Sequence, residues 1–229
     1  MIEVKNLTKK YQKFTAVDYI SLIAQPGKVT VLLGPNGAGK STTIKSIANL
    51  LKYEGVINIC GYPNASVEAK RCFGYVSETP VLYDLLTVEE HIDFIGHAYK
   101  VENYKEKAEK YLELFKLTDK RKSIAKELSK GMTQKLSMLL AMMIEPKALL
   151  VDEPMVGLDP QSIEDTLHIL RTVANEGCAV LISTHIIDIV SGIFDEAYIM
   201  NQGKIVKHVR KEELEEGTLK QYFFEMTGN

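Results

Sequence analysis

The sequence of 229 residues predicts an α/β fold in a single domain, and three observations predict it. Short apolar segments of the kind that form buried strands alternate with segments whose apolar residues repeat at helical spacing. Hydrophobic residues make up 45% and charged residues 25% of the chain, the balance of a globular protein with a packed core. A glycine-rich loop joins a strand-like segment to a helix-like one, which is typical of a ligand-binding α/β sheet.

The predicted core strands are short apolar runs, at 28–33, 147–151 and 178–183. Helical spacing of apolar residues predicts one helix over 40–51 and another between the second and third of these runs. Pro160, directly after Asp159, is typical of the first helical residue behind an N-cap. A polar turn at 201–204 separates two β-like runs, 196–200 and 205–209, and predicts a hairpin.

Residues 80–145 differ in character, because no strand pattern is evident there. Thr87 and Glu90 form a capping-box pattern that predicts the start of a helix. Apolar side chains follow at helical spacing from 104 to 115, and the run from 136 to 144 predicts a helix buried on most sides. We therefore predict one domain over 1–229, made of a core over 1–79 and 146–210, a helical insertion over 80–145 and a C-terminal tail over 211–229.

Charge, apolar length and cysteine spacing narrow the classes of function. The formal net charge is −2, from 28 Lys and Arg against 30 Asp and Glu, so we expect no nucleic-acid partner. No apolar run approaches the roughly 18 residues that span a bilayer, and the first residues show no signal-peptide pattern. The three cysteines, Cys60, Cys72 and Cys178, lack metal-binding spacing, so we expect free thiols in a reducing cytosol and no zinc.

Residues 34–41 read GPNGAGKS and match the phosphate-binding pattern G-x-x-x-x-G-K-[ST]. Glycines let the backbone approach a polyphosphate closely, and the N–H groups at the start of the following helix attract its oxygens. Lys40 would contact the β- and γ-phosphates, and the Ser41 hydroxyl would ligate Mg²⁺. The residues expected to hold the nucleotide here are Gly34, Pro35, Asn36, Gly37, Ala38, Gly39, Lys40, Ser41 and Thr42.

Two acidic residues end the strand-like segment ALLVDE at 148–153. Parallel sheets bind their ligands at the carboxyl ends of the strands. Asp152 would hold Mg²⁺, directly or through water, and Glu153 would orient and deprotonate an attacking water. His185 follows the next strand-like run, where it would contact the γ-phosphate or that water. The alternative for each residue alone is a solvated side chain at a strand end, and the phosphate loop in the same chain favours the nucleotide site.

Over about residues 2–210, the sequence resembles the nucleotide-binding subunit of ABC transporters. Five segments occur in the order and spacing of that family: GPNGAGKST, LSKGM at 128–132, ALLVDEP, GLDP at 157–160 and STH at 183–185. LSKGM distinguishes this family from other P-loop NTPases, although alone it would indicate only a helix cap. The resemblance implies a RecA-like P-loop NTPase sheet core with an antiparallel β part and a helical insertion subdomain.

In the family that the sequence resembles, two such subunits pair head to tail, and each ATP lies between the phosphate loop of one and the signature motif of the other. By position, Ser129 and Gly131 would contact the γ-phosphate of the partner's ATP. Asp159 would lie at the seam between the subunits. Tyr11 occupies the place of the aromatic residue that stacks on adenine, and its alternative is a tyrosine in a turn. The second subunit would be another copy of this chain or a similar chain.

The sequence departs from the family pattern at three positions. Glu78 stands where the family usually has Gln, and a carboxylate there would help to hold Mg²⁺ but would also repel the γ-phosphate. Lys130 and Met132 replace the usual second Gly and the usual Gln of the signature motif. That variant resembles the subunits of drug, antibiotic-peptide and polymer exporters, and it favours export over import.

The resemblance implies an ATPase that drives transport through a separate transmembrane permease subunit, with ATP and Mg²⁺ as cofactors and Lys40, Glu153 and His185 as catalytic residues. Its location would be cytoplasmic, on the inner face of the cell membrane through its partner. A soluble ABC-type ATPase in assembly or regulation is the alternative. A P-loop kinase or GTPase is disfavoured, because no guanine-reading Asn-Lys-x-Asp tetrapeptide occurs. A non-catalytic regulator is disfavoured by the acidic pair and His185, although Glu78 keeps that hypothesis open.

Overall fold

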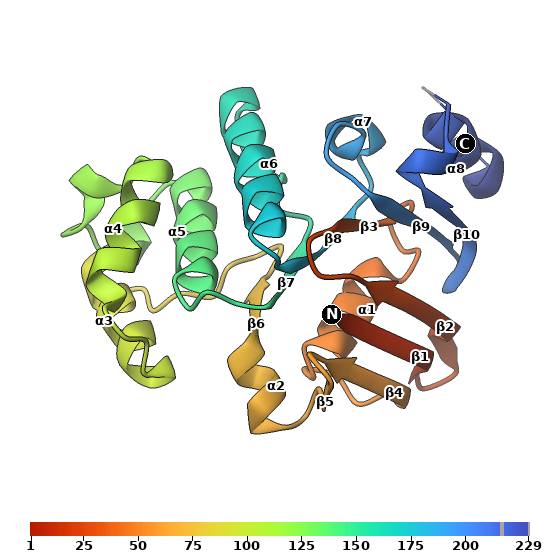
Figure 1. The fold of residues 1–229 in the computed structure, drawn as a ribbon, viewed down its shortest axis with the longest axis horizontal. Coiled ribbons are helices and arrows are strands. Elements are labelled where there is room, and N and C mark those ends of the chain that lie inside the picture. The colour runs from red at the N-terminus through yellow and green to blue at the C-terminus, as the bar shows by residue number, and fades with distance from the viewer. Residues whose placement is uncertain (216–217, 229) are drawn as a thin grey trace.

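The protein, in a computed structural model that describes residues 1–215 and 218–228, is built from two sheets with helices packed beside them (Figure 1). The larger sheet has six strands in the order β10-β9-β3-β8-β7-β6. These strands are β3 (Val29–Leu33), β6 (Phe73–Val76), β7 (Ala148–Asp152), β8 (Ala179–Thr184), β9 (Glu196–Asn201) and β10 (Lys204–Arg210). The pairs from β9 to β6 are parallel, and β10 pairs antiparallel with β9. The predicted α/β core is confirmed.

The central strands follow from their composition. Every residue of β3, β7 and β8 is buried, because helices or the second sheet cover both faces. Continuous apolar runs are what such strands require, and the three predicted runs match these strands to within one residue at each end. The predicted hairpin between β9 and β10 is also confirmed, since Gln202 and Gly203 form its turn with φ of 46° and 81°.

A second, antiparallel sheet has the order β2-β1-β4-β5. Its strands are β1 (Ile2–Tyr11), β2 (Phe14–Ala24), β4 (Glu54–Ile59) and β5 (Tyr62–Pro63). Buried residues alternate with exposed ones along the second half of β2, because one face packs on the core and the other meets solvent. The inner face shares one apolar cluster with helix α1 (Lys40–Ile47) and with Leu32, Leu150 and Leu181 of the larger sheet.

Helix α1 is shorter than the 40–51 segment predicted from its apolar spacing. It ends at Ile47, and Asn49 takes a left-handed φ of 58° that turns the chain away, so Leu51 lies beyond the helix. Helix α6 (Pro160–Asn175) begins behind its N-cap Asp159, as predicted. The remaining core helices are α2 (Val67–Cys72), α7 (Ile187–Val190) and α8 (Thr218–Thr227).

Three longer helices lie together on the side of the molecule away from the antiparallel sheet (Figure 1). They are α3 (Val88–Tyr99), α4 (Tyr104–Leu114) and α5 (Lys130–Met142), joined by short 3₁₀ turns at Thr118–Lys120 and Ala125–Glu127. The predicted capping box is confirmed: the Glu90 N–H donates to Thr87 Oγ1, and the Thr87 N–H donates to the Glu90 carboxylate. None of the helices within the described residues is long and apolar enough to cross a bilayer.

The packing of this helical part can be tested at Phe115, which is 2% exposed among the buried side chains that join α4 to α5. Phe115→Ala should lower the free energy of unfolding by about 3–5 kcal/mol, because it removes apolar contacts and leaves a cavity. Urea denaturation followed by circular dichroism measures the loss. The matched control is Leu114→Ala, whose side chain is 40% exposed. Equal losses in the two variants would contradict the assigned packing.

Candidate functional site

A cavity of about 570 Å³ opens at the carboxyl ends of β3, β7 and β8. Parallel α/β sheets bind ligands at this edge. The loops that follow these three strands supply most of the wall, and the turn between β1 and β2 supplies the outer rim. The lining residues are Tyr11, Phe14, Ala16, Asn36, Gly37, Gly39, Lys40, Ser41, Thr42, Glu78, Glu153, Val156 and His185.

Two glycines fix the path of the loop between β3 and α1. A Cβ atom on Gly34 would lie 2.3 Å from the carbonyl oxygen of Met200, and one on Gly39 would lie 2.5 Å from that of Ala16. Gly39 has a φ of 105° and is the N-cap of α1. The first N–H groups of α1 have no partners inside the helix, so the loop presents them to the cavity as an anion site.

Lys40 is buried, 5% exposed, and it links the loop to the end of β7. Its ammonium donates to the carbonyl oxygens of Gly34 at 2.9 Å and Pro35 at 3.1 Å. The same Nζ lies 3.3 Å from Glu153 Oε1, and that carboxylate is buried as well. A buried charge is stable only with a partner, so each of these two side chains holds the other in place.

Glu153 is held from three directions. Its Oε2 lies 3.1 Å from His185 Nδ1, and its Oε1 lies near Lys40. Its backbone N–H donates to the carbonyl oxygen of Ser183 at 3.1 Å and to the Ser183 hydroxyl at 3.2 Å. The φ of 46° is unusual for a residue with a side chain and costs free energy, as residues at functional sites often do. This conformation aims the carboxylate into the cavity.

Asp152 lies directly behind Ser41 and is fully buried. Its Oδ1 accepts hydrogen bonds from the Ser41 hydroxyl at 3.0 Å and from the Ser183 hydroxyl at 2.5 Å. Its Oδ2 is buried and has no hydrogen-bond partner within the described residues. A buried carboxylate oxygen without a partner is costly, and carboxylate and hydroxyl oxygens are the ligands that Mg²⁺ prefers. Asp152 and Ser41 therefore fit a magnesium site.

Glu78 lies on the loop after β6 and lines the cavity with an exposed side chain. Burial raises the pKa of Tyr75 to about 12, and the negative charges of Asp152 and Glu78 add to that effect. Both carboxylates thus raise the pKa of the same Tyr75 hydroxyl, so Glu78 lies on the side of the cavity that also carries Asp152.

Two aromatic rings stand at the mouth of the cavity. Tyr11 and Phe14 are paired across the turn between β1 and β2, and they are 45% and 66% exposed. The Lys9 ammonium lies 4.7 Å from the centre of the Tyr11 ring and so occupies one of its faces. Flat apolar rings open to solvent can stack on a planar heterocycle.

Ser129, Gly131 and Asp159 do not line this cavity. Ser129 is the N-cap of α5, and its hydroxyl accepts the N–H of Met132 at 3.3 Å. Asp159 is the N-cap of α6, and its carboxylate accepts the N–H of Ser162 at 3.0 Å. Hydrogen bonds from the Ser162 hydroxyl and N–H lower the pKa of Asp159. Ser129 and Asp159 are both exposed.

These two helix starts lie side by side. A Cβ atom on Gly157, just before α6, would come within 2.9 Å of the Lys130 side chain at the start of α5. A Cβ atom on Gly131 would meet Leu158 at 3.6 Å. We call Ser129, Gly131 and Asp159 the signature cluster. It presents two helix N-termini to solvent, and such ends favour anions.

The structure thus divides the predicted site residues between two places. The cavity brings together ten of the predicted residues from five separate segments, with Asp152 directly behind them, whereas the signature cluster lies apart. Gly34, Pro35 and Ala38 shape the phosphate loop without lining the cavity. Sequence reasoning missed four residues: Phe14, Ala16, Val156 and Ser183. Ser183 belongs to the STH segment, and this membership was the available sequence signal. In the structure its hydroxyl donates to the buried Asp152.

Comparisons with known proteins fit this geometry. A family model described as ABC transporter matches residues 17–156. The SkfA peptide export ATP-binding protein SkfE of Bacillus subtilis is 32% identical over 219 residues, which cover 94% of this chain and 92% of that protein. The linearmycin resistance ATP-binding protein LnrL of the same species is 35% identical, covering 90% and 68%. The bacitracin transport ATP-binding protein BcrA of Enterococcus faecalis is 32% identical, covering 99% and 75%.

Solved structures give the same result. The structure of an ATP-binding subunit of an ABC transporter superimposes with a TM-score of 0.88 at 33% identity, covering 97% of this chain and 93% of that one. The ADP conformation of an ATP-binding cassette of an ABC transporter, MJ1267, gives a TM-score of 0.79 at 31% identity, covering 93% and 92%.

The magnesium site can be tested at Asp152. Asp152→Asn should raise the Mg²⁺ concentration that half-saturates nucleotide binding by about tenfold or more, because a neutral amide replaces a buried anionic ligand. Fluorescent nucleotide titrations at a series of Mg²⁺ concentrations measure the shift. Asp119→Asn, at an exposed carboxylate, is the control and should leave the dependence unchanged. An unaltered dependence in Asp152→Asn would rule out the assigned ligand.

Proposed function

This chain belongs to the ABC transporter family as an ATP-binding subunit, an ATPase, and we propose that it powers export through a separate transmembrane subunit. The observation that carries this proposal is the cavity in which the phosphate loop, Asp152 and Glu153 meet at one sheet edge. The export direction rests on two supports. One is the signature variant with Lys130 and Met132, and the other is the set of peptide, bacitracin and linearmycin proteins that the chain resembles.

ATP binding in this cavity would begin with an exchange of partners at Lys40. The γ-phosphate carries more negative charge than the Glu153 carboxylate, so the ammonium would turn from Glu153 toward the phosphates. The N–H groups at the start of α1 would take the remaining phosphate oxygens. Tyr11 would stack on adenine with its free face, since Lys9 covers the other. Phe14, on the paired strand, would close the rim.

Mg²⁺ would be held by Ser41 and Asp152, with Glu78 as a further candidate. The Oδ2 atom of Asp152 supports this assignment. It is buried without a hydrogen-bond partner within the described residues, and Mg²⁺ would become its partner. When bound, the ion neutralises charge on the phosphate oxygens. The Ser183 hydroxyl keeps Asp152 in position by donating to the same Oδ1 that accepts from Ser41.

Glu153, once released by Lys40, would act as the general base on the attacking water. His185 lies 3.1 Å from the other carboxylate oxygen and would orient both the base and the γ-phosphate. The left-handed φ of Glu153 and its two backbone hydrogen bonds to Ser183 keep the carboxylate aimed at the cavity. Hydrolysis would then depend on these residues being fixed before ATP arrives.

A second ATP-binding subunit would complete the site. The signature cluster presents helix N-termini away from the chain's own cavity, so it would serve the cavity of a partner, either a second copy or a similar chain. The exposed Ser129 hydroxyl and the first N–H groups of α5 would meet the γ-phosphate there. Asp159 would lie at the seam. The pair of subunits would close on ATP and open after hydrolysis, and this motion would be the mechanical step.

The contact with the membrane subunit would form near Glu78. Val81, Tyr83 and Leu85 follow it on the loop into α3, with exposures of 92%, 58% and 78%. Phe94 of α3, 47% exposed, packs edge-on against Tyr83. An exposed apolar surface of this kind is typical of a protein contact. It joins the cavity loop to the helical part, so motion at Glu78 would reach a partner at the cytoplasmic face of the membrane.

The catalytic assignment can be tested at Glu153. Glu153→Gln should lower the rate of ATP hydrolysis by about 10²–10⁴-fold, because an amide cannot accept the proton of the attacking water. Nucleotide binding should persist, since the loop and Asp152 are unchanged. Phosphate release in single-turnover mixing measures the rate, and Glu164→Gln on the exposed face of α6 is the control. Hydrolysis at the wild-type rate would exclude Glu153 as the base.

The unusual carboxylate at Glu78 gives a separate prediction. Glu78→Gln should tighten the binding of ATP measured without Mg²⁺ by about two- to fivefold, since it removes a negative charge near the triphosphate. The gain should shrink as salt is added. Glu102→Gln, at an exposed position away from the cavity, should change nothing. Weaker binding by Glu78→Gln would contradict the repulsion.

A further inference from the structure

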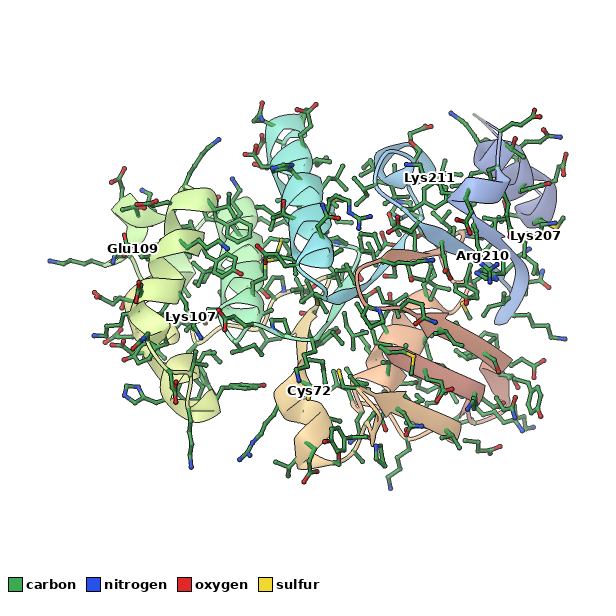
Figure 2. The ribbon with its side chains drawn as sticks, in the orientation of Figure 1. Cys72, Lys107, Glu109, Lys207, Arg210 and Lys211 are labelled. Atoms are coloured by element: carbon green, nitrogen blue, oxygen red, sulfur yellow. The ribbon has the colours of Figure 1, made fainter. Side chains whose placement is uncertain are left out.

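A second cavity, of about 320 Å³, lies where α4 and α5 meet the core. It sits at the amino ends of β7 and β8, the sheet edge opposite the phosphate loop. Its wall includes the apolar side chains Met142, Val173 and Cys178, all buried. Lys107 of α4, labelled in Figure 2, is part of its rim. The volume is at the low end of the range for small-molecule sites.

Tyr111 of α4 adds a hydroxyl to the wall of this cavity. The residue as a whole is 7% exposed and lines the cavity, and its hydroxyl is not one of the fully buried polar atoms that lack a partner within the described residues. Burial raises the pKa of Tyr111 to about 12, so the hydroxyl stays protonated and can donate. A ligand in the cavity would accept a hydrogen bond from this hydroxyl.

The charged side chains around the cavity favour a ligand with a single negative charge. Lys107 pairs with Glu145 at 2.8 Å, and Lys110 pairs with Glu176 at 3.6 Å. Lys147, also on the rim, has no ion pair among the residues that the structure describes. Three lysines against two glutamates leave an excess of one positive charge, which an anionic ligand would neutralise.

We propose that this cavity binds a small carboxylate with a short apolar tail. The carboxylate accepts hydrogen bonds from the Tyr111 hydroxyl and the Lys147 ammonium. The tail lies on Met142, Val173 and Cys178, where it removes apolar surface from water. Nothing in the proposed hydrolysis uses any of these residues.

The position of the cavity couples such a ligand to the signature cluster. Helix α5 begins behind Ser129 and ends at Met142, and α6 begins behind Asp159 and ends at Asn175, between Val173 and Glu176. Both helices that start at the signature cluster therefore end at this cavity. With 13 residues, α5 is about 20 Å long. A ligand held between their far ends changes the angle between the helical part and the core, and therefore moves Ser129; this consequence rests on the function proposed above.

Binding is tested with octanoate as the probe, by calorimetry on the full chain without nucleotide. The wild type should bind octanoate, Tyr111→Phe should bind about tenfold more weakly, and Val173→Phe, which fills the cavity, should not bind. Lys147→Gln, at an exposed side chain that cannot disturb folding, should also weaken binding. Tyr19→Phe, on an exposed tyrosine of β2, is the matched control. No binding by the wild type, or equal binding by all variants, overturns the proposal.

The coupling is tested by ATP hydrolysis with and without octanoate. The rate should change by at least twofold in the wild type and in Tyr19→Phe, and it should not respond in Val173→Phe. A wild-type rate that stays constant at saturating octanoate overturns the coupling. Because the binding experiment contains no nucleotide, its failure is distinguishable from a failure of the proposed ATPase mechanism.

Discussion

The buried ion pair between Lys40 and Glu153 is the contact on which the arrangement of the site depends. It joins the loop after β3 to the loop after β7, and neither charge could stay buried without the other. The strand order places β8 between β3 and β7, so the end of β8 fills the space beneath the pair. Ser183 and His185 therefore meet Asp152 and Glu153 as a consequence of topology. The polar network is fixed by the order of the strands.

The phosphate loop is held from outside by the antiparallel parts of the fold. Gly34 packs against the carbonyl of Met200 on β9, and Gly39 packs against that of Ala16 on β2. Gly203 in the β9–β10 turn donates to the carbonyl of Ala38 at 2.9 Å. These contacts leave no room for side chains and keep the loop in one shape before any ligand arrives. Such preorganisation is what lets backbone N–H groups stabilise phosphate charge effectively.

Sequence reasoning succeeded where the determining interactions are local or where burial is complete. The phosphate loop, the capping box and the α6 cap are short patterns, and β3, β7 and β8 are buried on both faces. It made no prediction for β1, where the left-handed Asn6 breaks the alternation of buried and exposed residues, and it placed the end of α1 too late, beyond Asn49. Ser183 escaped notice because its partner Asp152 is 31 positions away. Tertiary pairing of that kind leaves no local pattern.

Two features together imply an order of events in the catalytic cycle. Lys40 occupies one Glu153 oxygen and His185 the other, so the carboxylate in this arrangement is not free to take a proton. A triphosphate that draws Lys40 toward its phosphates would free Glu153 to act on the attacking water. Ser129 of the signature cluster heads α5 of the helical part, whereas Asp159 heads α6, which packs on β3 and β8 of the larger sheet. Since the signature cluster does not line the chain's own cavity, hydrolysis would require both ATP in the cavity and a partner closed over it.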